Sequence, residues 1–131
     1  MSKPIWIEAE LVLAIHDRQL VEHGGAAGLR DEALLDSAHG GLMNQFAYES
    51  ADVVGLAAKY TAGIVQNQPF VDGNRRTAFV IGILFLELNG YRFTASEEAA
   101  AQAILELAAG TMDEKALCAF LRANSKRTKA Q

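Results

Sequence analysis

The chain has 131 residues, half of them hydrophobic, and a formal net charge of −4. This length suits one domain with a single hydrophobic core. Four of the 12 basic residues lie near the C-terminal end: Arg122, Lys126, Arg127 and Lys129. The remainder of the chain has 8 basic against 16 acidic residues, a charge of −8. Such an acidic body argues against a protein that binds nucleic acid through a face rich in lysine and arginine.

The cysteine content and the hydropathy of the chain indicate the cellular compartment. The one cysteine, Cys118, lies in an apolar helical pattern and has no second cysteine to pair with, which is typical of a reducing environment. The first residues lack the apolar stretch of a signal peptide, and the longest strongly apolar run, 79–86, is too short to span a bilayer. We therefore expect a soluble, cytoplasmic protein with no membrane partner.

The first third of the chain is expected to contain two helices. Residues 5–7 are interpreted as an edge strand, and hydrophobic spacing predicts a helix over about 8–22 that ends at the glycines Gly24 and Gly25. Asp31 is expected to cap a short helix over 32–39. Residues 40–50 have no clean period and are interpreted as a loop.

Four more helices are predicted in the rest of the chain. Ser50 is expected to cap a buried helix that ends near residue 66, and a second apolar helix covers 74–88. After an extended link at 91–93, Thr94 and Thr111 are expected to begin capping boxes for helices that end at 109 and 123. Residues 1–123 would form the domain, and 124–131 a basic, frayed tail. The fold class predicted is all-α, a single compact bundle of about six helices.

The stretch 68–79, Gln-Pro-Phe-Val-Asp-Gly-Asn-Arg-Arg-Thr-Ala-Phe, joins the two central predicted helices. A helix N-terminus has unpaired backbone N–H groups and the positive end of the helix dipole, and Gly73 lets an anion approach closely. Arg75 and Arg76 add guanidinium groups, while Asp72 offers a hard oxygen ligand for Mg²⁺. The pattern indicates a phosphate site with magnesium, although ordinary turn and capping chemistry at Asp72 and Asn74 explains the same residues without a ligand.

This string resembles the signature of the Fic/Doc family, and most closely that of its Doc-like (death-on-curing) branch, His-Pro-Phe-x-Asp-Gly-Asn-Lys/Arg-Arg-Thr-Ala. Every signature position from Pro69 to Ala78 fits, but Gln68 stands where histidine is expected. A second match, Gly-Gly-x-x-Gly-Leu-Arg-Asp at 24–31 followed by Ala-Leu-Leu-Asp-Ser-Ala, extends the resemblance to nearly the whole chain.

The resemblance implies ATP and Mg²⁺ as cofactors and gives each motif residue a role. Asp72 would bind Mg²⁺, and Gly73 and Asn74 would supply the donors of an anion hole. Arg75 and Arg76 would neutralise the phosphates as charge develops. The family also assigns Phe70 the role of the buried anchor that fixes the loop.

Position 68 would carry the general base, and a carboxamide has no titration near neutral pH. Loss of a positioned base typically costs about 10²–10⁴-fold in rate, so we expect Gln68 to leave a nearly inactive protein that still binds nucleotide. Gln68 is either a detoxifying change or the mark of a natural pseudoenzyme. His16, His23 and His39 lie outside the motif and are not expected to replace the base; His16 is interpreted as a structural residue and His39 as a surface one.

Two substitutions bear on the reaction. Fic-type adenylyltransferases have a glycine and a second arginine where this chain has Arg75 and Phe79, whereas Doc-like toxins share the present pattern. The resemblance therefore implies first a protein kinase that transfers the γ-phosphoryl group of ATP to a hydroxyl of elongation factor Tu, and second an adenylyltransferase.

Partners also follow from the resemblance. The chain would be the toxin of a type II toxin–antitoxin system, bound by a Phd-like antitoxin whose disordered C-terminal segment folds as a helix in a groove. DNA would be contacted only through the antitoxin. A catalytically dead antitoxin-binding and co-repressor module remains a third interpretation.

Overall fold

The computed structural model describes residues 4–33, 35–36 and 52–128. In these parts of the chain, five helices have defined ends: α1 (Ala9–His23), α3 (Val53–Asn67), α4 (Asn74–Leu88), α5 (Glu97–Ala109) and α6 (Glu114–Ala123). Strands β1 (Tyr91–Phe93) and β2 (Ser125–Arg127) form one antiparallel pair, with Arg92 opposite Lys126. The predominantly helical architecture is compatible with the predicted all-α class, with a two-stranded sheet added and five bounded helices where about six were expected.

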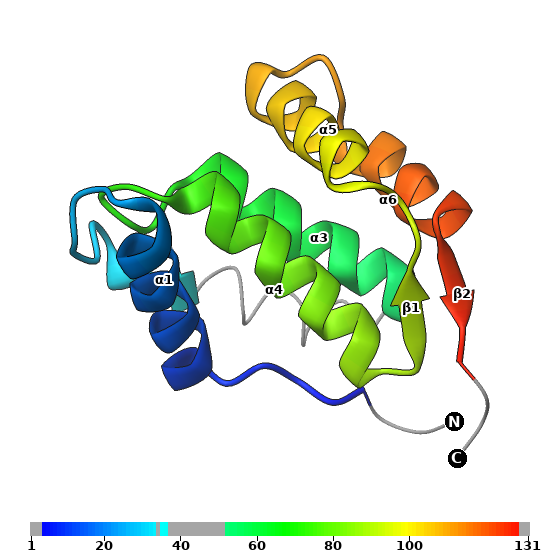
Figure 1. Ribbon diagram of the computed structural model, residues 1–131, viewed down its shortest axis with the longest axis horizontal. Coiled ribbons are helices and arrows are strands. Elements are labelled where there is room, and N and C mark those ends of the chain that lie inside the picture. Colours follow the sequence, from blue (N-terminus) through cyan, green and yellow to red (C-terminus); the bar gives the residue numbers. More distant parts are fainter. Residues whose placement is uncertain (1–3, 34, 37–51, 129–131) are drawn as a thin grey trace.

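Helices α3 and α4 run side by side through the middle of the molecule (Figure 1) and pack together more extensively than any other two described elements. Their close approach depends on Gly82, because a side chain there would collide with the hydroxyl of Thr61. That hydroxyl donates to the Ala57 carbonyl at 2.9 Å and so is satisfied within its own helix. The central, mostly buried helix predicted before the motif is confirmed, since nine residues of α3 are buried.

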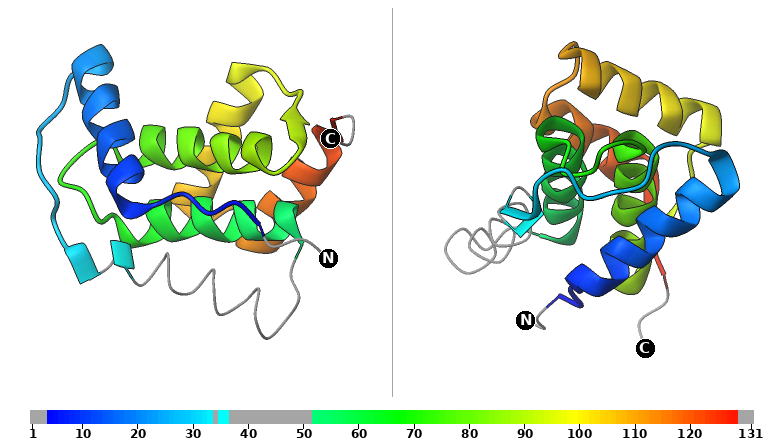
Figure 2. Two further views of the ribbon diagram at one scale, coloured as in Figure 1. Left: turned by 90° about the horizontal axis from the view of Figure 1, so that it is seen from below. Right: turned by 90° about the vertical axis from the view of Figure 1, so that its left-hand side faces the viewer.

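The remaining helices cover this pair from two sides. Helix α1 packs against α4, while α5 and α6 lie on the opposite side of the α3–α4 pair (Figure 2). The motif lies in the connection between α3 and α4, at the end of the pair that α1 and the chain after it approach (Figure 1). None of the helices in the described residues is long and apolar enough to cross a membrane.

The first expected strand is absent, because residues 4–8 have no regular secondary structure. The side chain of Asn89 bonds this segment instead, accepting from the Ile5 N–H at 2.6 Å and donating to the Ile5 carbonyl at 3.0 Å. Ile7 is only 1% exposed. The apolar residues at 5–7 therefore belong to a non-regular segment that buries Ile7, and not to a strand.

Two predicted helix caps, those of α5 and α6, are wrong by two residues. The residues whose side chains accept a hydrogen bond from the first turn of α3, α5 and α6 are Asp52, Ser96 and Asp113. The hydroxyls of the two threonines expected as caps bond elsewhere, Thr94 to the Asn124 carbonyl and Thr111 to the Glu106 carbonyl.

Part of the C-terminal segment that was expected to be a tail forms strand β2. Ser125–Arg127 pairs with Tyr91–Phe93, and Thr128 donates from its backbone N–H to the Gly90 carbonyl at 2.8 Å. The guanidinium of Arg127 lies 5.4 Å from the centre of the Tyr91 ring. The extended link at 91–93 therefore finds its partner in the segment that was expected to be a tail.

The short helix after Asp31 is described only in part. Residues 32, 33, 35 and 36 are helical, and the Asp31 side chain accepts from the Ala33 N–H at 3.0 Å, as expected for a cap. The predictions for the rest of this helix, for the loop at 40–50, and for Ser50 and His39 fall outside the described residues.

Candidate functional site

The connection between α3 and α4 begins at Gln68, which ends α3 in the left-handed conformation with φ 49° and ψ 60°. It is the only non-glycine residue with positive φ among the described residues. Such backbone conformations cost roughly 1–3 kcal/mol and persist where the surrounding structure imposes them. The side chain of Gln68 is exposed and lines a cleft.

Arg30 holds this turn from a distant part of the chain. Its Nε donates to the Gln68 carbonyl and its Nη2 to the Asn67 carbonyl, both at 2.7 Å. The backbone N–H groups of Arg30 and Asp31 both donate to the Pro69 carbonyl, at 2.6 and 3.0 Å. Three successive carbonyls at the end of α3 are thus satisfied by two residues of one loop.

The middle of the connection is closed by Asn74 and Phe70. The Asn74 side chain accepts from the Phe70 N–H at 3.0 Å and donates to the Phe70 carbonyl at 2.9 Å. The Phe70 side chain is 1% exposed, and its ring stacks on that of His16 with centroids 3.8 Å apart. Asn74 therefore shapes the loop through its amide, while its backbone N–H lies in the first turn of α4.

Asp72 projects from this loop with its carboxylate exposed. The carboxylate accepts from the backbone N–H of Ala26 at 3.2 Å and from that of Gly73 at 2.8 Å. These two hydrogen bonds hold the pKa of Asp72 below its ordinary value of 3.8, with a smaller contribution from the charge of Arg76. A side chain on Gly25 would come within 2.8 Å of the carboxylate, so the approach of this loop requires glycine. Asp72 is an anion at neutral pH.

The first turn of α4 has no side-chain cap. Gly73 occupies the N-cap position with φ 79°, and no side chain accepts from the N–H groups of the turn. Arg75 and Arg76 are exposed in this turn and make no hydrogen bond or ion pair to any residue in the described ranges. Unpaired N–H groups, the helix dipole and two guanidinium groups together form a site for an anion.

This helix end forms one wall of a cleft of about 740 Å³. That volume lies in the range of small-molecule sites. The cleft is lined by residues of the motif and by an apolar set contributed by α3, α4 and α5: Val65, Phe79, Ala101, Ile104, Leu105 and Ala108. It could accommodate a ligand that combines anionic groups with an apolar, planar part, as a nucleotide does.

The structure brings together the motif residues that the sequence singled out. Gln68, Asp72, Gly73, Asn74, Arg75 and Arg76 all line this one cleft, whereas Phe70 lies beneath it in the core. No group of three or more His, Cys, Asp or Glu side chains that could hold a metal occurs in the described residues. Asp72 is the carboxylate in the cleft, and Mg²⁺ is commonly bound by one or two carboxylates together with substrate phosphates.

Neither of the two described histidines, His16 and His23, lines the cleft. His16 is 2% exposed and is absent from the cleft wall, and its Nε2 lies 2.7 Å from the Asp72 carbonyl oxygen. His23 is exposed at the end of α1, where its nearest acidic partner is Glu22 at 4.0 Å. The expected structural role of His16 agrees with this burial.

Sequence reasoning missed how three residues contact the motif. His16, Ala26 and Arg30 lie 38 to 56 positions before their partners in the motif. The one available signal was the second matching segment at 24–31, whose contact with the motif, including a bridge between Leu29 and Phe70, appears only in the folded chain.

Comparison with known proteins gives two findings. Residues 6–86 match the model of a family described as the Fic/DOC family. A curated relative, "Protein kinase doc" of Escherichia phage P1, is 32% identical over 95 residues, which cover 72% of this chain and 75% of the relative. The matched family segment contains α1, α3, the motif connection and most of α4.

Proposed function

Because this chain belongs to the Fic/DOC family, we propose that it is a Doc-like toxin, a protein kinase by descent whose activity Gln68 has removed. The observation that carries this proposal is the uncapped N-terminus of α4, which faces a nucleotide-sized cleft together with Asp72, Arg75 and Arg76. The similarity to a relative named a protein kinase supports the same reaction class.

The cleft would bind ATP by its phosphates at the start of α4. The free N–H groups of the first turn and the guanidinium groups of Arg75 and Arg76 are donors suited to phosphate oxygens. The apolar lining from α5 and Phe79 offers a surface for the base. Asp72 would hold Mg²⁺, which neutralises phosphate charge when bound.

Two positions favour transfer of the γ-phosphoryl group over transfer of adenylate. Arg75 occupies the position where the adenylyltransferases of the family have a glycine that leaves room for further phosphates, and its long side chain lies in the cleft wall. Phe79 occupies the position of their second arginine, and its ring contacts that of Phe93 with centroids 6.5 Å apart. A phenyl ring cannot bind phosphate by charge.

Gln68 would leave the site without its general base. The side chain lies in the cleft wall close to the motif, where a family histidine would take the proton of the target hydroxyl. A glutamine cannot accept that proton at neutral pH, and such a loss costs about 10²–10⁴-fold in rate. Nucleotide binding should persist, because the phosphate donors are unchanged.

The proposed target is a hydroxyl of elongation factor Tu, and the proposed regulatory partner is a Phd-like antitoxin that brings DNA to the complex indirectly. Both follow from the family and fit a cytoplasmic location. Gln68 also favours a second function, an inactive module that binds antitoxin and contributes to repression, because that role needs no base.

The experiment is an intact-mass measurement of elongation factor Tu after incubation with Mg-ATP and the Gln68→His variant. The matched controls are the chain with Gln68 and the double variant Gln68→His/Asp72→Asn, which has the base without the metal ligand. We expect a phosphoryl-sized gain in mass with Gln68→His alone. An adenylyl-sized gain would transfer the assignment to the adenylyltransferases, and no gain with Gln68→His would refute the proposed kinase and target.

A further inference from the structure

His16 is a buried polar residue whose side chain makes one hydrogen bond within the described residues, and that bond is to the motif. It lies on α1, 56 positions before Asp72, and its Nε2 is 2.7 Å from the Asp72 carbonyl oxygen. The side chain is nearly enclosed, with the residue 2% exposed. Phe70 stacks on its ring at 3.8 Å with only 8° between the planes, so the imidazole is fixed in position and in tilt.

The direction of this hydrogen bond follows from chemistry. A carbonyl oxygen only accepts, so Nε2 must carry the proton and donate it. The other ring nitrogen, Nδ1, is 4.0 Å from the exposed carboxylate of Asp17, too far for a hydrogen bond. The donor of the contact with the Asp72 carbonyl is therefore the Nε2–H group of His16.

This hydrogen bond restrains the backbone of Asp72, while other contacts restrain its carboxylate. The backbone carbonyl is held by His16, and the carboxylate is held by the N–H groups of Ala26 and Gly73. Gly73 follows directly, and a β-carbon there would be 3.6 Å from His16 Nε2. The imidazole therefore supports the backbone at the residue pair that joins the carboxylate to the uncapped helix end.

We propose that His16 is a positioning residue for Mg²⁺ in this cleft: by donating to the Asp72 carbonyl it orients the carboxylate toward the bound phosphates. This inference rests on the proposed nucleotide site. His16 itself does not line the cleft and does not touch nucleotide or metal. Residues that orient a metal ligand commonly change metal affinity by about 10–100-fold when they are replaced.

Two substitutions separate the donor from the ring. His16→Phe keeps a flat ring that can stack on Phe70 but has no N–H group for the Asp72 carbonyl. His16→Gln keeps an N–H donor of similar reach but has no ring. A residue that merely fills the core would be replaced best by phenylalanine, whereas a donor that positions Asp72 would be replaced best by glutamine.

The experiment measures binding of a non-hydrolysable ATP analogue by calorimetry, once with Mg²⁺ and once with EDTA, on the chain with Gln68. The readout is the ratio of the two affinities, the gain due to Mg²⁺, and it requires no catalysis. We expect His16→Phe to reduce this gain by about 10-fold or more and to leave binding in EDTA unchanged. His16→Gln should retain most of the gain. Thermal unfolding of each variant establishes that it is folded.

Asp72→Asn provides the matched control, because it removes the metal ligand itself. It should reduce the gain due to Mg²⁺ by at least as much as His16→Phe does, and the double variant His16→Phe/Asp72→Asn should keep the residual gain of Asp72→Asn if His16 acts through Asp72. An additional loss of the same size in the double variant would contradict the inference, since it would place the effect of His16 elsewhere.

The outcomes distinguish this inference from the proposed function. If the unsubstituted chain shows no binding of the analogue with Mg²⁺, the proposed nucleotide site fails and the inference fails with it. If it binds with a gain due to Mg²⁺ and His16→Phe keeps that gain, only the role of His16 is refuted. Equal losses in Mg²⁺ and in EDTA would likewise refute it, because they indicate general support of the loop.

Discussion

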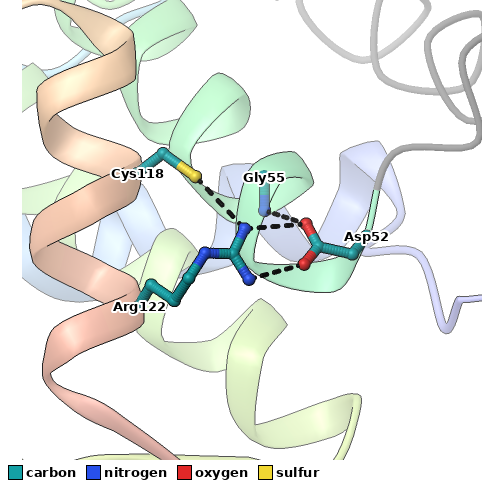
Figure 3. A network of polar contacts seen from close by, with 4 residues as sticks. All are labelled: Asp52, Gly55, Cys118 and Arg122. Carbon is teal, nitrogen blue, oxygen red and sulfur yellow. Dashed lines mark hydrogen bonds and ion pairs between the residues drawn. The ribbon is translucent and has the colours of Figure 1, made fainter.

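The N-termini of α3 and α4 contrast within one molecule. At the start of α3, the Asp52 side chain accepts from the Gly55 N–H at 2.9 Å, and the Arg122 guanidinium bonds both carboxylate oxygens at 2.7 and 3.2 Å (Figure 3). Cys118 lies 3.7 Å from the same guanidinium. Asp52 and Arg122, the described charged groups of this contact, are therefore paired with each other.

The start of α4 has no such closure. A glycine stands at the cap position, the side chains there accept nothing from the first turn, and Arg75 and Arg76 line the cleft without a hydrogen bond or ion pair to a described residue. Both helix ends carry the same dipole. The difference teaches that at α3 this potential contributes to stability, whereas at α4 it is left available to a ligand.

The largest expected effect is on nucleotide binding at the uncapped N-terminus of α4, here called the open end. The double variant Arg75→Ala/Arg76→Ala removes two charged donors to phosphate and should weaken Mg-nucleotide binding by about 10²- to 10⁴-fold, since such contacts contribute roughly 1.5–3 kcal/mol each. Calorimetry with an ATP analogue measures this loss. The melting temperature should not fall, because neither side chain bonds another described residue. A large fall in melting temperature would contradict the statement that the two arginines are available to a ligand and do not stabilise the fold.

The second effect is on stability and concerns the Asn74 side chain, which bonds the loop before α4. Asn74→Ala removes both hydrogen bonds to the Phe70 backbone and should lower the free energy of unfolding by about 2–3 kcal/mol, because buried backbone groups lose their partners. Denaturant unfolding measures the change. Asn74→Asp, which keeps an acceptor for the Phe70 N–H, should be less destabilising than alanine; equal losses would place the effect outside these bonds.

At the capped N-terminus of α3, here called the closed end, Asp52→Ala removes both the cap and the ion pair with Arg122. We expect a loss of about 1–2 kcal/mol in the free energy of unfolding, the usual cost of losing an N-cap. Affinity for nucleotide should not change, since Asp52 is not in the cleft wall. Asp52→Asn, which retains an oxygen for the Gly55 N–H, is the matched control. A fall in nucleotide affinity with either variant would contradict the separation of the two helix ends into one that stabilises the fold and one that binds a ligand.

The smallest effect is that of the ion pair alone, and it depends on pH. The Arg122 guanidinium holds the pKa of Asp52 below its ordinary value of 3.8. Because the folded-state pKa is depressed, the stabilisation is complete above pH 3.8 and is lost as the pH falls through the folded value. With side chains 55% and 48% exposed, Arg122→Met should cost only about 0.2–1 kcal/mol.

Denaturant unfolding of Arg122→Met and of the unsubstituted chain at several pH values checks this sign. The difference in stability between the two proteins should be constant near neutral pH and should shrink in acid below pH 3.8. A difference that grows as the pH falls would mean that the pair is not what lowers the pKa of Asp52.

Local sequence features predicted the central helices well. The boundaries of α4 were expected at Asn74 and Leu88 and occur there, because apolar spacing and the Asn89-Gly90 pair are signals read over a few residues. Caps were placed less well, since Ser96 and Asp113 competed with threonines two residues earlier. Several side chains near a helix start can cap it, and packing selects among them.

The segments that lack periodicity were predicted least well. The pairing of β1 with β2 joins residues more than thirty positions apart, such as Phe93 and Ser125, and three-residue strands carry too few side chains to indicate a partner. Residues 5–7 were misassigned for a related reason, because a non-regular segment that bonds to Asn89 and buries Ile7 has the same apolar composition as a strand.

The sequence by itself determined the helices and the composition of the motif, because helix formation and an Asp-Gly-Asn-Arg-Arg turn are set by neighbours along the chain. Only the tertiary structure placed His16 beneath Asp72 and Arg30 on the end of α3. Those contacts depend on how α1 and the loop after it pack against the α3–α4 pair, and such packing is a property of the whole core. The open helix end is therefore encoded locally, but its support is encoded across the fold.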